Sequence, residues 1–248
     1  MNASIWIGFD PRETDAYAVA RHTARRASCI PFPVHGIILD DMRRLGVYTR
    51  ETQIRDGVLF DVISQAPMST EFAISRFLTP YLAKGLTTHI SARQRGWALF
   101  VDADVMFVGD PWKLFEDARS HPEFAVMCVK HNFNPPAGTK MDGQVQTQYA
   151  RKNWSSVMLF NLDHPANDAL TPELVNTLPG RDLHRFCWLD DKEIGELDPS
   201  WNFLVGHHSA ETVRPNIIHF TDGVPSMDGY EKSDFASAWR EALNHWGR

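Results

Sequence analysis

The sequence lacks the features that mark membrane-spanning, secreted and nucleic-acid-binding proteins. No apolar stretch approaches the roughly 20 residues that a transmembrane helix needs. The 25 Lys and Arg residues are outnumbered by 31 Asp and Glu residues, which gives a net charge of −6. We therefore expect no nucleic-acid partner held by a general basic surface. The N-terminus has no basic region followed by a long apolar run, so we expect no signal peptide.

Cysteine is also scarce. Cys29, Cys128 and Cys187 lie far apart, are odd in number and do not have the spacing of a metal-binding motif. This pattern predicts buried free thiols in a reducing compartment, which favours a cytoplasmic location. Internal repeats, low-complexity tracts and linkers are absent too. With 248 residues, 43% of them hydrophobic, the chain is predicted to form a single domain over residues 1–248 with a sizeable core.

The most informative stretch is residues 97–107, where an apolar run leads directly into Asp102 and Asp104. A short continuous apolar run predicts a buried strand, and such a strand needs helices on both faces of an α/β sheet. The two carboxylates then lie at the carboxyl end of the strand, where open α/β sheets bind ligands. Like charges this close need a compensating cation, and a divalent metal carrying a phosphate group is the simplest one. The alternative is an ordinary turn that closes the strand.

The N-terminal residues predict a strand over 5–9, a helix over 15–27 and a strand over 34–39, which is the opening of a nucleotide-binding α/β unit. The loop after the first strand would then lie at the ligand edge. There Phe9 could stack on a base, Asp10 could accept a hydrogen bond from it, and Arg12 could reach a phosphate. An ordinary strand-to-helix turn explains each of these residues equally well.

Further along the chain, residues 71–84 have a helical pattern that Pro80 should kink or break, and this helix carries Arg76. Residues 130–152 form a long stretch without periodicity, which predicts either an anion-facing loop that includes Lys140 or a solvated surface loop. Strands are predicted at 155–161 and 216–220. An apolar stripe near the C-terminus predicts a helix that packs on the domain.

Four of these segments occur in the order found in a known family. They are the first strand with its acidic turn, the Arg76 helix before the Asp-x-Asp strand, the strand at 155–161, and the Ile-Ile-His219-Phe segment. This ordered set resembles the family 8 glycosyltransferases, and the resemblance extends over most of the chain. It implies a single Rossmann-like GT-A domain of the α/β class, with a mixed, mainly parallel central sheet flanked by helices. Residues 1–110 would form the nucleotide-binding half, and residues 111–248 the acceptor and metal half.

The resemblance also implies roles for individual residues. In those enzymes the two aspartates and a C-terminal histidine bind manganese, and the matching residues here are Asp102, Asp104 and His219. Such a donor set suits Mn²⁺, with Mg²⁺ as the alternative. Asp191, with Asp190 beside it, matches an acidic pair near the reacting sugar. The nucleotide-sugar donor would be contacted by Phe9, Asp10, Arg12, Arg76, Asp102, Lys140, Ser155 and Gly223.

The sequence departs from the family pattern at three places. Trp154-Ser155-Ser156 occupies positions where relatives have Asn-Ala/Ser-Gly, Asp191 is followed by Lys192 instead of Gln, and Ser226 stands where a C-terminal Lys would fall. These changes bear on the donor sugar and on the stereochemistry of transfer.

The implied reaction is metal-dependent transfer of a sugar from a nucleotide diphosphate, UDP-sugar in those relatives, to an acceptor hydroxyl with retention of configuration. One alternative is a nucleotide- or carbohydrate-binding module without transfer activity. A sugar-1-phosphate nucleotidyltransferase would have a Gly-rich N-terminal loop, whereas Gly8 stands alone here. A haloacid-dehalogenase-like phosphatase would have Thr or Val at the position of Met106.

Overall fold

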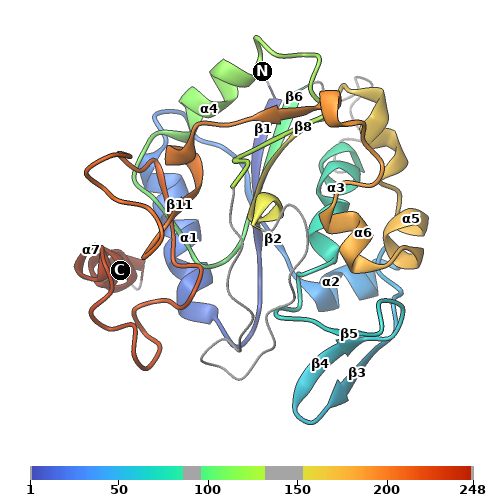
Figure 1. The fold of residues 1–248 in the computed structure, drawn as a ribbon, viewed down its shortest axis with the longest axis horizontal. Helices are drawn as coiled ribbons and strands as arrows, with labels where there is room; N and C mark the ends of the chain where they lie inside the picture. The colour runs from blue at the N-terminus through green and yellow to red at the C-terminus, as the bar shows by residue number, and fades with distance from the viewer. Residues whose placement is uncertain (1, 86–95, 132–152, 247–248) are drawn as a thin grey trace.

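The structure is a computed structural model, and it describes residues 2–85, 96–131 and 153–246. A central sheet lies between two layers of helices (Figure 1). The strand order of this sheet is β10-β8-β9-β6-β1-β2. Its strands are β1 (Asn2–Gly8), β2 (Val34–Ile37), β6 (Gly96–Val101), β8 (Val126–Cys128), β9 (Val157–Asn161) and β10 (Ile194–Glu196).

The pairing of these strands is mixed. β1 is parallel to both β2 and β6, and β10 is parallel to β8, whereas β9 runs antiparallel to β6 and to β8. The predicted α/β fold with a mixed, mainly parallel sheet is therefore confirmed. The predicted strand at 97–107 consists of β6 and a second strand, β7 (Val105–Phe107), separated by a turn at residues 102–104.

The core has two layers, one on each face of the sheet. Every residue of β6 is buried, and successive residues contribute to opposite layers: Phe100 packs in one, and Leu99 and Val101 in the other. This alternation follows from the period of two of a strand. A strand that is apolar on both faces can be stable only where helices cover both, which is the arrangement seen.

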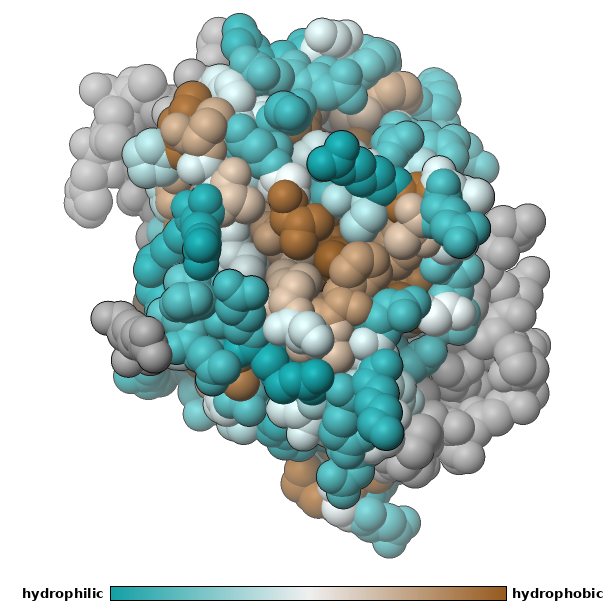
Figure 2. Space-filling view, turned by 90° about the vertical axis from the view of Figure 1, so that its left-hand side faces the viewer, coloured by the Kyte–Doolittle hydropathy of each residue, from teal (hydrophilic) through white to brown (hydrophobic). Residues whose placement is uncertain are grey.

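The helices divide between the two faces. On one side lie α1 (Thr14–Ala27), α4 (Pro111–Ala118) and α7 (Ala236–Trp246), and on the other lie α2 (Leu39–Arg44), α3 (Thr79–Gly85), α5 (Pro172–Thr177) and α6 (Gly180–His184) (Figure 1). The face that carries α1 and α7 is mostly hydrophilic, with apolar side chains gathered in a hollow near its centre (Figure 2). Within the described residues, no helix is both long enough and apolar enough to cross a bilayer.

Two small sheets complete the fold. One has the order β11-β12-β7, with β11 (Phe203–Leu204) and β12 (Ile217–His219). The other, β3-β4-β5, consists of β3 (Thr52–Arg55), β4 (Val58–Asp61) and β5 (Ala66–Pro67), and its β3–β4 hairpin projects from the body (Figure 1). Five short 3₁₀ helices are also described: η1 (Ser75–Leu78), η2 (Trp154–Ser156), η3 (Pro165–Ala169), η4 (Asp191–Glu193) and η5 (Pro199–Asn202).

Some local predictions need correction. Residues 71–84 do not form one helix: residues 71–74 are a turn, residues 75–78 are η1, and Pro80 lies in the first turn of α3. Proline is tolerated there because the first turn has no intrahelical acceptor for its missing N–H. All three cysteines are free, but only Cys128 is buried, while Cys29 and Cys187 are exposed.

Candidate functional site

The turn between β6 and β7 carries the two aspartates to the carboxyl end of the sheet. The backbone N–H of Asp102 donates to the carbonyl of Ser156 at 2.9 Å, which fixes this turn against the start of β9. Asp104 lies directly before β7, and its carbonyl accepts a hydrogen bond from the N–H of Phe220 at 2.9 Å. The predicted position of the acidic pair at the carboxyl end of a buried strand is thus what the structure shows.

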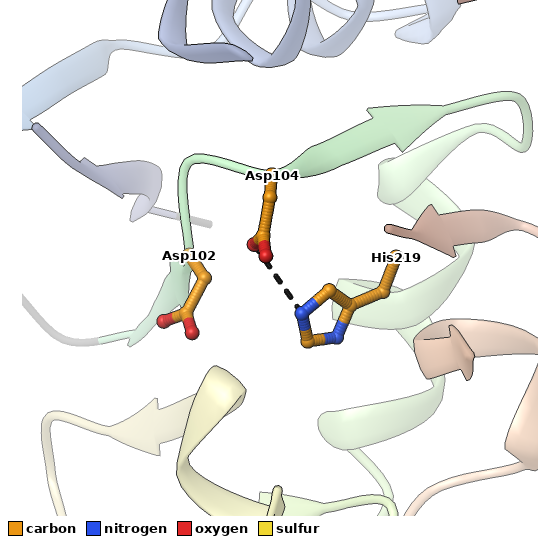
Figure 3. A group of neighbouring side chains, drawn as sticks. All are labelled: Asp102, Asp104 and His219. Atoms are coloured by element: carbon orange, nitrogen blue, oxygen red, sulfur yellow. Dashed lines mark ion pairs between the residues drawn. The ribbon is translucent and has the colours of Figure 1, made fainter. Parts of the chain in front are cut away.

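His219 reaches the same place through the small β11-β12-β7 sheet. β12 pairs antiparallel with β7, with His219 opposite Val105. This register places the imidazole beside Asp104, and its Nε2 lies 3.3 Å from Asp104 Oδ1. One donor atom from each of Asp102, Asp104 and His219 lies within 4.8 Å of the other two. The three side chains point toward a common centre from two different sheets (Figure 3).

This donor set fits a divalent metal ion. Two carboxylates and one imidazole are ligands suited to Mn²⁺, and they leave coordination positions for other oxygens. Metal-bound histidines usually donate their second ring N–H to a neighbour. His219 satisfies this condition, because its Nδ1 lies 2.8 Å from the side-chain oxygen of buried Asn202.

Arg76 is a buried residue that holds the Asp102 carboxylate in place. Its guanidinium forms an ion pair with Asp102 at 2.7 Å and donates to the carbonyl of Ser155 at 2.9 Å. The cation also lies over the rings of Phe72 and Phe100, at 5.2 and 5.1 Å from their centroids. Arg76 is only 5% exposed, so its charge is committed to Asp102 and to the two aromatic faces.

A cavity of about 690 Å³ opens over these residues. Its described lining includes six carboxylates and two guanidinium groups: Glu13, Asp61, Asp102, Asp104, Asp222, Asp228, Arg76 and Arg181. One of the acids, Asp61, is fully buried in a salt bridge with Arg50. The lining also includes apolar side chains, among them Met68, Phe72 and Val224. The cavity can therefore contact both an apolar ring and a cation.

Glu13 is a cavity residue that the sequence reasoning missed. It is the N-cap residue of α1, and its side chain makes no capping hydrogen bond. Burial, together with the nearby charges of Asp104, Asp10 and Asp102, raises the pKa of Glu13 to about 8. Glu13 is thus a third carboxyl group beside the acidic pair, and its raised pKa means that the charges around it disfavour its ionised form. This end of the sheet carries an excess of negative charge.

Ser155 and Gly223, both predicted to contact the donor, line the cavity. Ser155 Oγ lies 2.7 Å from Nδ1 of His184, a second cavity residue that the sequence reasoning missed. Burial and the charge of Arg76 lower the pKa of His184 to about 3, so its ring is neutral at pH 7. A Cβ atom at Gly223 would overlap the ring of Tyr230, at 2.5 Å, which explains glycine at this position.

The turn at residues 9–12, which was predicted to contact the nucleotide, does not line the cavity. Phe9, Asp10 and Arg12 are not among the residues that line the cavity. Asp10 is fully buried, and its carboxylate accepts hydrogen bonds from the Arg12 guanidinium, from the Arg12 N–H and from the Glu71 N–H. Burial alone would raise the pKa of Asp10, but the bonds from Arg12 and Glu71 outweigh it and hold the pKa below its usual value. Asp10 and Arg12 therefore fix the turn that presents Glu13.

The structure does not bring Asp190 and Asp191 to the acidic pair. They lie at the start of η4, directly before β10, and both are exposed. β10 is parallel to β8, and through β9 both run in the same direction as β6. Residues that precede β10 therefore lie at the opposite edge of the sheet from Asp102, which follows β6. This placement does not support the predicted position beside the reacting sugar. Lys140 lies outside the described residues.

Comparison with known proteins gives a relative in sequence and several in structure. No protein-family model matches the chain. Protein CDI of Arabidopsis thaliana is 41% identical over 248 residues, a match that covers 98% of this chain and 87% of that protein.

Three solved structures illustrate the likeness in fold. The bifunctional glycosyltransferase WbbM has a TM-score of 0.59 at 14% identity, over 98% of this chain and 49% of that chain. GlyE of Streptococcus pneumoniae TIGR4 has a TM-score of 0.57 at 14% identity, over 100% of this chain and 63% of that one. The galactosyltransferase LgtC, solved with donor and acceptor sugar analogs, has a TM-score of 0.55 at 14% identity, over 98% of this chain and 95% of that one. This chain thus spans about half of WbbM, and its fold is the predicted GT-A fold of glycosyltransferases.

Proposed function

This chain belongs to the same family as Protein CDI of Arabidopsis thaliana, and we propose that it is a metal-dependent glycosyltransferase. It moves a sugar from a nucleotide diphosphate, of which UDP is our first choice, to an acceptor hydroxyl. The observation that carries the proposal is the convergence of Asp102, Asp104 and His219 within 4.8 Å at a cavity of a glycosyltransferase fold. The resemblance to family 8 enzymes further supports transfer with retention of configuration at the sugar.

Asp102, Asp104 and His219 would hold Mn²⁺, or Mg²⁺ as the alternative. When bound, the metal supplies positive charge that stabilises the leaving diphosphate. Arg76 holds the Asp102 carboxylate in place through its ion pair. Arg181 also lines the cavity; its side chain is 73% exposed and lies 3.5 Å from Asp182, and such an exposed pair can exchange for an anionic ligand.

The remaining lining orients the sugar. His184 is hydrogen-bonded to the backbone of Ala73, and we assign that bond to Nε2–H, so that Nδ1 accepts the hydroxyl proton of Ser155. Ser155 Oγ is thereby left as an acceptor at the cavity wall, where it can bind a hydroxyl of the ligand. The apolar side chains of Met68, Phe72 and Val224 can pack against a sugar ring or a base and exclude water from it.

The proposal is tested by incubating the protein with a panel of nucleotide-sugars, with and without Mn²⁺, and measuring both thermal shift and release of the nucleoside diphosphate. We expect a metal-dependent shift with one class of donor and release of its nucleoside diphosphate, both abolished by EDTA. Asp104→Asn provides the control. A protein that neither shifts nor releases nucleotide with any donor would refute the proposal.

A second candidate is a nucleotide- or carbohydrate-binding module without transfer. The observation that favours it is the composition of residues 220–230, which follow His219 along the cavity and contain no Lys or Arg. A metal-dependent thermal shift without nucleotide release, in the presence and absence of added acceptors, would select this candidate.

A further inference from the structure

Asn202 is a buried polar residue that lies next to His219 without lining the cavity. It ends η5, directly before β11, and its side chain is 0% exposed. β11 runs parallel to β12, with Leu204 opposite His219. The pairing of these strands therefore sets the distance between Asn202 and the imidazole, and an amide buried at such a position must have its hydrogen bonds satisfied within the protein.

The neighbours of Asn202 fix which way its amide points. The Ser156 hydroxyl donates to the carbonyl of Asn153 at 2.7 Å, so its oxygen is available only as an acceptor. Asn202 Nδ2 lies 2.9 Å from that hydroxyl oxygen and 3.4 Å from the Asn153 carbonyl. Both neighbours require an N–H donor. The NH₂ group must therefore face them, and the amide oxygen must face His219.

This orientation determines the tautomer of His219. The amide oxygen of Asn202 lies 2.8 Å from His219 Nδ1, and an oxygen acceptor there requires that Nδ1 carries the proton. In a neutral imidazole the other nitrogen is then an acceptor. In the neutral ring, His219 Nε2 therefore presents its lone pair toward Asp104 Oδ1, 3.3 Å away. Two acceptors at this separation are stable together when a cation is shared between them.

We propose that Asn202 is a positioning residue that keeps His219 in its Nδ1–H tautomer and so keeps Nε2 available to the metal. This inference rests on the proposed function. Without the Asn202 acceptor, the ring proton would move to Nε2, where it could be donated to Asp104. That hydrogen bond would occupy two of the three metal ligands with each other. Asn202 thus keeps the Nε2 lone pair of the neutral ring directed at the metal position.

The test compares three variants. Asn202→Asp retains an oxygen facing His219 Nδ1, and Asn202→Leu removes it at similar volume. Asn167→Leu is the matched control, because Asn167 is also an asparagine and 2% exposed. Its hydrogen bonds are made to Ala125, Asn161 and Trp188, away from the acidic pair.

The first readout is the tautomer of His219 in the metal-free protein, from the ¹⁵N chemical shifts of its ring nitrogens. We expect the Nδ1–H form in the wild type, in Asn202→Asp and in Asn167→Leu, and the Nε2–H form in Asn202→Leu. A wild-type ring protonated at Nε2 alone would overturn the proposal, and this measurement does not depend on whether any variant folds.

The second readout is Mn²⁺ affinity by calorimetry. We expect Asn202→Leu to lose about 10- to 100-fold in affinity, the range typical for loss of such a supporting contact, and Asn202→Asp to retain most of it. Unchanged affinity in Asn202→Leu, or an equal loss in Asn167→Leu, would overturn the positioning role while leaving the proposed function intact. A wild-type protein that binds no Mn²⁺ would instead refute the metal dependence in the proposed function, and the role assigned to Asn202 would fall with it.

Discussion

Removal of one carboxylate from the acidic pair should stabilise the metal-free protein while abolishing metal binding. The change is Asp104→Asn, which keeps the shape of the side chain and removes its charge. The backbone carbonyl of residue 104 still accepts the hydrogen bond from Phe220. What is lost is the repulsion of Asp104 against Asp102 and Glu13, and the attraction of Asp104 for a cation.

The magnitude follows from the separation of the charges. Two carboxylate oxygens 4.8 Å apart, the upper limit of the spacing between the ligand atoms, repel by about 1 kcal/mol in water and about 3.5 kcal/mol at an effective dielectric constant of 20. The ion pair between Arg76 and Asp102 offsets part of this repulsion. We therefore expect the metal-free variant to gain roughly 1 to 3 kcal/mol in its free energy of unfolding.

The order should reverse when metal is added. At 1,000 times the dissociation constant, bound Mn²⁺ stabilises the wild type by about 4.1 kcal/mol, which exceeds the advantage of the metal-free variant, and the variant gains nothing. Urea unfolding with EDTA and with excess Mn²⁺ measures both effects. Asp117→Asn, the same change at an exposed position of α4, should respond to Mn²⁺ as the wild type does. If Asp104→Asn is less stable than the wild type in EDTA, the carboxylate has a structural role and the reasoning is wrong.

Three further predictions concern buried charges around the cavity. Arg50→Met leaves the fully buried Asp61 without its partner, so the free energy of unfolding measured in urea should fall by about 3 to 5 kcal/mol. The neutral, buried His184 and His131 both have pKa values lowered to about 3, so the unfolded chain binds more protons than the folded one between pH 6.5 and 3. The free energy of unfolding should therefore decrease as the pH is lowered from 6.5 to 3, and it should decrease less steeply in His184→Phe. Because the pKa of Glu13 is raised to about 8, Glu13→Gln should raise the melting temperature of the metal-free protein at pH 8 and leave it unchanged at pH 4.

The acidic pair could be predicted from the sequence because its signal is local. The apolar run before Asp102 determines both a buried strand and the end of that strand, and the carboxyl end of such a strand is the ligand edge. His219 has no comparable local signal, since a histidine at the end of a short apolar segment is equally compatible with a core position. Only the resemblance to a family indicated its role, and the antiparallel register of β12 with β7 shows how the role is possible.

The position of Asp190 and Asp191 in the fold could not be predicted, for an equally specific reason. They were assigned to the reacting sugar only by their match to an acidic pair of the family 8 glycosyltransferases, and their own residue pattern does not locate them. The strand that matters is the one after them, Ile194–Glu196, which is too short for any periodicity to be recognised. An acidic pair that precedes a parallel strand lies at the opposite edge from one that follows it. The direction of the adjacent strand therefore decides the location, and the residue pattern alone does not contain it.

Glu13, Asn202 and His184 were missed for a third reason, since each acquires its position from a long-range contact. Glu13 is presented by a turn whose buried Asp10 carboxylate accepts a hydrogen bond from the N–H of Glu71, 61 residues away. The roles of His184 and Asn202 depend on Ser155 and Ser156, which lie in η2 directly before β9. Hydrogen bonds between side chains 29 and 46 residues apart leave no periodic pattern in the sequence.

The charged residues of the cavity lining predict an order of binding for the proposed metal and nucleotide. Of the guanidinium groups in its described lining, Arg76 is committed to Asp102, which leaves Arg181 at the edge against several carboxylates. A diphosphate that entered this cavity alone would meet an excess of negative charge at short range and gain little from one exposed arginine. A divalent ion bound first by Asp102, Asp104 and His219 reverses the sign of the potential at that point. For the proposed metal-dependent transferase we therefore expect the metal to bind before the nucleotide, with Arg76 on Asp102 and Asn202 on His219 holding two of its ligands in place.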